Sequence, residues 1–418
     1  MPIEQRKVAP PKLAVEDASE TSDADDETGS NRSSVLSYAR ERVPMMFFLC
    51  LVAVFLCNRA LHWGQNESSS NEAALAAART HDALAWVAGN SLDDIGNDEL
   101  KQQRDGFMVL GMHRSGTSML TGLLHMAAGY TYGAAVYKGG ENPTGFFERF
   151  DAVRQNDMWM RSQGVNWNNN VLNYSWEKSL EDLELGNRDE LFKTGKRTMR
   201  FFNNPKNAPW LQKDPRMCIT LKTWLNLEVW KKGDKKKMEQ VLSKEPAIVF
   251  TYRNPLETAL SLQKRGKPMY VARGLQLWMA YNMRAIQNSR GLCIVRTSNA
   301  AVVANPSEEL QRISDKLTNK CGVIAPATRV KQTEIAKFID PKLQHHNVKA
   351  NDEQEVLETH NDGTCVVHSY ESMRQKGTPA YNQERKMYLQ AMKIFCDFQS
   401  GKAYKEDYEW PDMSEKLI

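Results

Sequence analysis

Two short stretches of this chain carry residue types that bind phosphate. The first, Gly111-Met-His-Arg-Ser-Gly-Thr-Ser118, lies between an apolar run at 107–110 and a helix-like run at 119–128. Its glycines permit a tight turn, so backbone N–H groups entering the helix can point at one anion, at the positive end of the helix dipole. The spacing matches the GxxxxGK[ST] loop of nucleotide-binding proteins, but Thr117 replaces the lysine. An ordinary NTPase is therefore disfavoured, and Arg114 could supply the missing positive charge.

The second stretch, Arg253-Asn-Pro-Leu-Glu-Thr-Ala-Leu-Ser261, also follows an apolar run, at 247–252. Asn254 is a favoured N-cap and Pro255 suits the first helical position, so a helix is predicted to begin here. Ser261 then lies about two turns further on, on the same helix face as the cap. Taken alone, the stretch could equally hold a surface arginine and an ordinary helix serine. With the first stretch, it predicts a ligand with phosphate at both ends.

In this order, the two stretches resemble those of the sulfotransferases that use 3′-phosphoadenosine 5′-phosphosulfate (PAPS). The resemblance covers about residues 105–345 and is nearest to the bacterial-type branch. It is strengthened by further runs in the same order: Glu141-Asn-Pro-Thr-Gly-Phe-Phe-Glu148, Gln155-Asn-Asp157, Gly164-Val-Asn-Trp167, Lys213-Asp-Pro-Arg216, Gly274-Leu-Gln-Leu-Trp278, Tyr281-Asn282 and Phe338-Ile-Asp-Pro-Lys-Leu343. The chain departs from the branch at Arg296-Thr-Ser-Asn-Ala-Ala-Val302, where the branch usually has Ser-Tyr-x-x-Leu.

The resemblance implies transfer of a sulfuryl group from PAPS to an acceptor hydroxyl, without a metal. It implies that Arg253 and Ser261 bind the 3′-phosphate of the donor. It implies that the 5′-phosphosulfate is bound by the first stretch, through Arg114, Ser115, Gly116, Thr117 and Ser118. The acceptor, a carbohydrate, a protein tyrosine or a small alcohol, is not fixed by the sequence.

Two catalytic residues follow from the same resemblance. Glu148 is the first candidate for the base that activates the acceptor hydroxyl, and Lys213 would neutralise the transferring sulfate. His113 is a competing base, and Glu148 could instead be a structural carboxylate paired with Arg149 or Arg154. Two other functions stay open. They are a P-loop-type nucleotide or sugar kinase that uses Lys213 and magnesium, and a relative that binds the donor without turning it over.

The expected fold is α/β, a P-loop-like three-layer sandwich with a central parallel sheet. Apolar β-like runs at 107–110, 247–252 and 292–295 alternate with helical stretches, as in a parallel sheet covered on both faces. Both phosphate-binding stretches then lie at the carboxyl ends of strands, where open α/β sheets bind ligands. Helical insertions are expected at 181–202 and 225–242.

The catalytic domain is expected at 105–345, with a C-terminal extension at 346–418. The extension is predicted to contain a strand at 364–368 and a helix at 382–398. A formal net charge of +4 is too small to favour nucleic acid as a partner. The cysteines form no CxxC pair, which disfavours zinc, and up to two disulfides could form among Cys218, Cys293, Cys321, Cys365 and Cys396.

The N-terminal part is predicted to be a membrane anchor with its flanking segments. Residues 1–42 are rich in Asp, Glu, Ser and Pro and are expected to be a disordered cytoplasmic tail. Residues 43–57 carry no charge, and as a helix they would span about 22 Å of a hydrocarbon core of about 30 Å. A signal peptide does not follow a long polar segment, so residues 43–63 are predicted to be a transmembrane anchor, with a stem at 64–104.

Arginines flank this segment unequally. Arg40 and Arg42 precede it, whereas only Arg59 follows its apolar run closely, which favours a cytoplasmic N-terminus and a lumenal catalytic domain. A short span suits the thinner membranes of the early secretory pathway, so a type II protein of the Golgi membrane is expected. Candidate glycosylation sites are then the tripeptides at Asn66 and Asn173.

Overall fold

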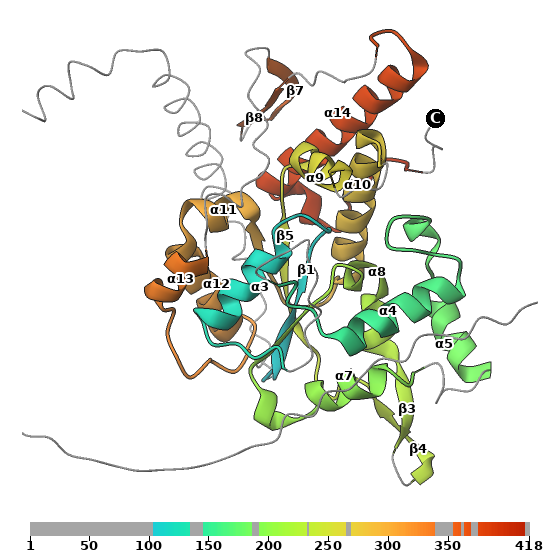
Figure 1. Ribbon diagram of the computed structural model, residues 1–418, viewed down its shortest axis with the longest axis vertical. Coiled ribbons are helices and arrows are strands. Elements are labelled where there is room, and N and C mark those ends of the chain that lie inside the picture. Colours follow the sequence, from blue (N-terminus) through green and yellow to red (C-terminus); the bar gives the residue numbers. More distant parts are fainter. Residues whose placement is uncertain are drawn as a thin grey trace, which may run out of the picture. The chain divides into compact units, whose positions relative to one another are not determined.

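The described part of the chain lies in one of two units. The computed structural model describes residues 103–133, 145–185, 192–231, 234–264, 269–338, 354–360, 363–368 and 375–413 (Figure 1). The chain divides at residue 69, and all of these ranges belong to the unit that begins at Ser70.

A four-stranded parallel sheet forms the centre of this unit. Its strand order is β2-β1-β5-β6, and its strands are β1 (Gly106–Leu110), β2 (Trp210–Lys213), β5 (Ala247–Tyr252) and β6 (Ile294–Ser298). Val109 pairs with Lys213 on one side and with Val249 on the other. The predicted strands at 107–110 and 247–252 are confirmed, and the one at 292–295 begins two residues later than expected. The sequence reading missed β2.

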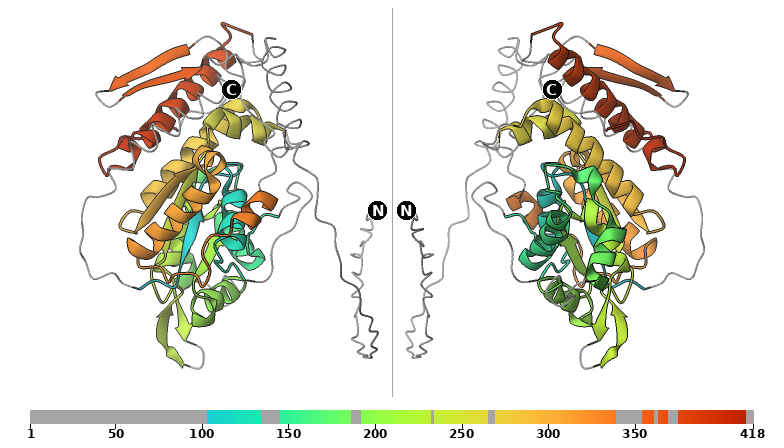
Figure 2. Two further views of the ribbon diagram at one scale, coloured as in Figure 1. Left: turned by 90° about the vertical axis from the view of Figure 1, so that its left-hand side faces the viewer. Right: turned by 90° about the vertical axis from the view of Figure 1, so that its right-hand side faces the viewer.

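Side chains alternate along β1 between two separate hydrophobic cores. Phe107 and Val109 belong to one core, which also contains residues of α3 (Thr117–Met126), α12 (Pro306–Asn319) and α13 (Gln332–Phe338). Met108 and Leu110 belong to the other core, with residues of α4 (Phe150–Ser162), α7 (Gly195–Phe202), α8 (Met217–Asn226), α9 (Pro255–Gln263), α10 (Val271–Asn288) and α14 (Pro379–Gln399). Helices therefore cover both faces of the sheet (Figure 2), and the prediction of a mixed α/β fold with a central parallel sheet is confirmed.

The insertions between the strands only partly match the expectation. The 181–202 region is helical at both ends, in α5 (Trp176–Leu185) and α7. The 225–242 region is not a helical insertion, because beyond the last residues of α8 it forms an antiparallel hairpin of β3 (Glu228–Lys231) and β4 (Asp234–Gln240). Exposed Glu228 and buried Val229 show the alternation of a strand. The remaining short elements are α11 (Asn299–Ala304), η2 (Val171–Asn173), η3 (Pro205–Asn207) and η5 (Lys402–Tyr404).

The C-terminal part of the described chain joins the core of the sheet. The predicted strand at 364–368 lies in β8 (Gly363–His368), which pairs with β7 (Gln354–His360), and the predicted helix at 382–398 lies in α14. Helix α14 packs along α10 (Figure 1). The Phe398 ring lies 4.9 Å from Tyr252 and 5.3 Å from Phe250, measured between ring centroids. This segment therefore completes the core rather than forming a separate appendage.

The described residues show the state of four of the five cysteines that were considered for disulfides. Cys293 and Cys321 form a disulfide that joins the start of β6 to the end of α12. Cys396 is also disulfide-bonded, whereas Cys218 is a buried free thiol.

The predicted location in the Golgi membrane is corrected by the helices of the described residues. None of these helices is long and apolar enough to cross a membrane. A spanning helix needs about 20 mostly apolar residues. The longest described helix, α14, carries Glu384, Arg385, Lys386, Lys393 and Asp397. The predicted tail (1–42) and anchor (43–63) lie outside the described residues, as does the predicted stem (64–104) except for its last two residues.

Candidate active site

The first phosphate-binding stretch forms a tight loop between β1 and α3. Arg114 and Gly116 both adopt the left-handed backbone conformation, at φ 67° and 81°, which is favourable only for glycine and costs other residues about 1–2 kcal/mol. No side chain caps the N-terminus of α3. Because the first turn of a helix has N–H groups without intrahelical partners, these donors can bind an oxyanion.

A buried hydroxyl group in the loop fits the same ligand. The Ser115 side chain is fully buried, and its Oγ has no hydrogen-bond partner in the described part of the chain. A buried hydroxyl without a partner costs about 1–3 kcal/mol. A phosphate oxygen within reach of Oγ would remove this cost.

The second stretch starts α9 as predicted. The Asn254 side chain accepts hydrogen bonds from the main-chain N–H of Leu256 (2.9 Å) and Glu257 (3.2 Å), and Pro255 is the first helical residue. Arg253 is held at both ends, because its carbonyl oxygen accepts from Trp278 Nε1 at 2.9 Å and its Nε donates to Glu257 Oε2 at 2.7 Å. The guanidinium group of Arg253 is therefore fixed at the carboxyl end of β5.

A hydrogen bond joins the two stretches across 147 residues of sequence. Arg114 Nε, in the first loop, donates to Ser261 Oγ, on the second helix, at 2.8 Å. Ser261 is only 4% exposed. Arg253 precedes the start of α9, whereas Ser261 lies near its end. The groups predicted to hold the two phosphate ends of one ligand thus lie next to each other.

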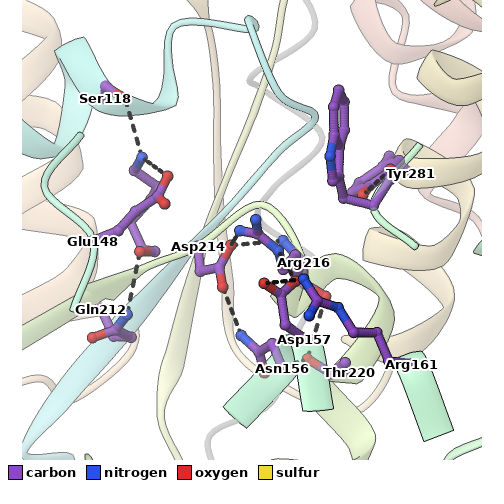
Figure 3. A network of polar contacts seen from close by, with 12 residues as sticks. Ser118, Glu148, Asn156, Asp157, Arg161, Gln212, Asp214, Arg216, Thr220 and Tyr281 are labelled. Carbon is purple, nitrogen blue, oxygen red and sulfur yellow. Dashed lines mark hydrogen bonds and ion pairs between the residues drawn. The ribbon is translucent and has the colours of Figure 1, made fainter. Parts of the chain in front are cut away.

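Glu148 and Lys213 form a buried ion pair beside the phosphate loop (Figure 3). Lys213 Nζ, at the end of β2, donates to Glu148 Oε1 at 2.7 Å and to Ser118 Oγ at 3.0 Å. Burial raises the pKa of Glu148 more than the attraction of Lys213 lowers it. Of the suggested structural partners, Arg149 pairs with Asp151 at 2.7 Å and Arg154 lies over the Phe150 ring.

A second polar network fixes the residues that follow Lys213 (Figure 3). Asp214 is fully buried and accepts from Asn156 Nδ2 at 2.8 Å and from Arg216 NH1 at 2.9 Å. Arg216 Nε donates to Asp157 Oδ1 at 2.7 Å. The Asn156–Asp157 pair on α4 therefore meets the Lys213–Arg216 run, and this network sets the position of Lys213 against the loop.

His113 packs between two aromatic rings. Its ring centroid lies 4.9 Å from that of Trp167 and 5.5 Å from that of Tyr281. Tyr281 is fully buried, and its hydroxyl donates to the main-chain oxygen of Trp167 at 2.6 Å. The runs that contain His113, Trp167 and Tyr281 are distant in the sequence, and they meet at the phosphate loop. Trp224 and Trp278 are fully buried core residues, and Trp167 is partly buried and packs against the same core.

The stretch at 296–302, where the sequence departs from the resemblance, runs from the end of β6 into α11. Strand β6 ends at Ser298, whose Oγ accepts from the Ala301 N–H at 3.1 Å and caps α11. A side chain at Gly116 would collide with the Asn299 side chain. Asn299 therefore borders the phosphate loop, and the sequence reading did not select it. The signal was present in the Ser298-Asn299 pair, which lies three residues beyond the β-like run at 292–295 and is typical of a helix start.

Among the residues that the structure describes, no group of three or more His, Cys, Asp and Glu side chains could hold a metal ion. Of the predicted site residues, Arg114, Ser118, Glu148, Lys213 and Ser261 are brought together in two hydrogen-bonded groups.

Comparisons with known proteins return two solved structures. No family model matches the sequence, and no curated protein matches it. The chain is similar to the sulfotransferase domain from the Synechococcus PCC 7002 olefin synthase, with 13% identity and a TM-score of 0.31 over 61% of this chain and 88% of that one. It is also similar to the sulfotransferase domain from the curacin biosynthetic pathway, with 13% identity and a TM-score of 0.32 over 60% and 82%. Both are sulfotransferase domains, the class of protein that the motifs of this sequence resemble.

Proposed function

We propose that this chain transfers a sulfuryl group from PAPS to the hydroxyl group of an acceptor. The hydrogen bond between Arg114 and Ser261 is the observation that carries the proposal. It brings an uncapped helix start and a second anion-binding stretch to one place. A donor with phosphate at both ends of a nucleoside needs this arrangement, whereas a ligand with a single phosphate chain does not.

The donor would be held from two sides. Main-chain N–H groups of Gly116, Thr117 and Ser118, with the Ser115 hydroxyl, would bind the phosphosulfate end. Arg253 and Ser261 would bind the 3′-phosphate. The charge of Arg253, held in place by Glu257, is suited to a phosphate in a partly buried site.

Lys213 would stabilise the charge that develops during transfer. By analogy with phosphoryl transfer, the sulfuryl group moves in line from the phosphate oxygen to the acceptor oxygen, and the protein supplies position and positive charge. Lys213 Nζ lies at hydrogen-bond distance from Ser118, in the first turn of α3. From there its ammonium group could turn from Glu148 toward the sulfuryl oxygens.

Glu148 would then act as the base. A carboxylate with a raised pKa is a stronger proton acceptor than an exposed one, and a pKa nearer the working pH favours general base catalysis. As long as Lys213 stays bound to Glu148, its charge opposes protonation of that carboxylate. Movement of Lys213 toward the sulfuryl group would leave Glu148 free to accept the proton of the acceptor hydroxyl.

One observation favours a second candidate function, a P-loop-type kinase. Lys213 reaches the phosphate loop from the neighbouring strand, so it could replace the lysine that the loop itself lacks at Thr117. Such a kinase would need magnesium and would use ATP as its donor.

The test compares the two donors on the full chain. We expect labelled sulfate to pass from PAPS to hydroxyl acceptors in the presence of a chelator, and no transfer from ATP. Ser261→Ala should weaken binding of adenosine 3′,5′-bisphosphate by about tenfold, because one buried hydrogen bond to a charged group is lost. Transfer from ATP that stops when a chelator is added would instead support the kinase.

A further inference from the structure

A tight turn borders the phosphate loop on the side of His113. Two main-chain hydrogen bonds close it, from Asn166 N to Asn169 O at 3.0 Å and from Asn169 N to Asn166 O at 3.1 Å. Trp167 and Asn168 form the tip. We call Asn166–Asn169 the tryptophan turn. Because the Trp167 ring packs on His113 in the loop, the turn lies beside the place where the phosphosulfate end of the donor would bind.

Two side chains of helix α10 donate hydrogen bonds to oxygen atoms of the tryptophan turn and hold it in place. The Tyr281 hydroxyl donates to Trp167 O at 2.6 Å, and Arg273 NH2 donates to Asn168 O at 2.9 Å and to Asn169 Oδ1 at 3.2 Å. Burial lowers the pKa of Arg273, and its partners on the turn are neutral oxygens rather than carboxylates. Arg273 therefore fixes the turn at the two residues that follow Trp167.

The side chains of the turn are suited to a neutral hydroxylated ligand. None of the residues from Gly164 to Val171 is charged, and the run contains one tryptophan and four asparagines. Asn166 is exposed and Asn168 is partly buried. An amide both donates and accepts hydrogen bonds, as sugar hydroxyls do, and an indole face suits the apolar face of a sugar ring. The cation beside the turn, Arg273, donates to Asn168 O and Asn169 Oδ1, and the turn itself offers an acidic peptide or an anionic alcohol no positive side chain.

We propose that the tryptophan turn is the acceptor subsite and that the acceptor is a neutral carbohydrate whose ring packs on Trp167. This inference rests on the proposed function. In this position one sugar hydroxyl would face the sulfuryl group across the phosphate loop. The amides of Asn166 and Asn168 would bind neighbouring hydroxyls. Trp167 thereby selects the class of acceptor without taking part in donor binding.

The test uses the full chain with labelled PAPS and three acceptor panels: neutral oligosaccharides, tyrosine peptides and simple alcohols. The variants are Trp167→Ala, Trp167→Phe and Asn168→Ala. Trp176→Ala is the matched control, because Trp176 is, like Trp167, partly buried and packed against the core, but it lies on α5 beside Lys222. For each variant, the acceptor KM, kcat and the Kd for adenosine 3′,5′-bisphosphate are measured separately.

We expect neutral oligosaccharides to be the preferred acceptors. Trp167→Ala should raise their KM by about tenfold, the value of one lost aromatic contact, while the bisphosphate Kd stays within about twofold. Trp167→Phe should recover most of the loss, and Trp176→Ala should leave KM unchanged. Preference for tyrosine peptides or simple alcohols, or an unchanged oligosaccharide KM in Trp167→Ala, would overturn the proposal. Failure of the wild-type chain to bind the bisphosphate would instead reject the proposed function.

Discussion

Replacing Lys213 by methionine tests the ion pair at the centre of the site. The substitution keeps most of the side-chain length but removes the charge that Glu148 contacts at 2.7 Å. Glu148 is 7% exposed, so its carboxylate cannot be solvated by water instead. Breaking a buried ion pair by removing one partner costs about 3–5 kcal/mol, and we expect Lys213→Met to lower the free energy of unfolding at pH 7 by this amount.

The double variant Lys213→Met with Glu148→Gln separates the lost charge from the lost packing. It leaves no unpaired charge, so it should lose only about 1–2 kcal/mol, less than Lys213→Met alone. The measurement is urea unfolding of the full chain at pH 7, followed by tryptophan fluorescence. Equal stabilities of the single and double variants, or a loss below about 1 kcal/mol in Lys213→Met, would refute the reasoning.

The same pair predicts a pH dependence with a definite sign. The pKa of Glu148 in the folded chain lies above its usual value of 4.5, so folding favours the protonated carboxyl group. The resulting stability is fully present below the unfolded-state pKa and is lost as the pH rises through the folded-state pKa. Without Lys213 the folded-state pKa rises further, so the destabilisation of Lys213→Met should be smaller at pH 5 than at pH 7. Equal losses at both pH values would contradict this explanation.

Substitutions at Glu148, Gly116 and Asn254 test the catalytic base and the two phosphate-binding stretches. Glu148→Gln should slow transfer at least about 100-fold with an almost unchanged Kd for the bisphosphate, and it should remove the fall in rate at low pH that protonation of Glu148 causes in the wild type. An unchanged pH–rate profile would assign the base elsewhere. Gly116→Ala should lower stability by about 1–2 kcal/mol in thermal unfolding, because of its φ of 81° and the Asn299 side chain beside it. Asn254→Ala should cost about 1 kcal/mol in the same assay through the lost cap of α9, whereas Asn254→Asp should cost much less.

Strands β1 and β5 were predicted because they are almost wholly apolar. Strands β1 and β5 are buried along their whole length, so they read as continuous hydrophobic runs, and each is followed by a clear loop or helix start. Strand β2 was missed because it ends in Gln212 and Lys213, which are each 1% exposed. Polar residues at these positions serve the site and hide the strand pattern. The hairpin of β3 and β4 was read as helix because its lysine-rich sequence does not look like a strand.

The site could be predicted residue by residue but not as a set of contacts. The resemblance to a known family suggested Glu148 and Lys213 separately, yet their ion pair joins positions 65 residues apart. The contact of Arg114 with Ser261 and the packing of His113 between Trp167 and Tyr281 depend in the same way on how the strands and helices are arranged. Sequence patterns report local structure well, whereas such contacts follow only from the fold.

The most direct test of the central claim is a crystal structure of the full chain with adenosine 3′,5′-bisphosphate. The account predicts one bound nucleotide, with its 5′-phosphate on the N–H groups of Gly116–Ser118 and its 3′-phosphate on Arg253 and Ser261. A nucleotide that binds with only one of its phosphates at these two stretches, or that binds elsewhere, would contradict it.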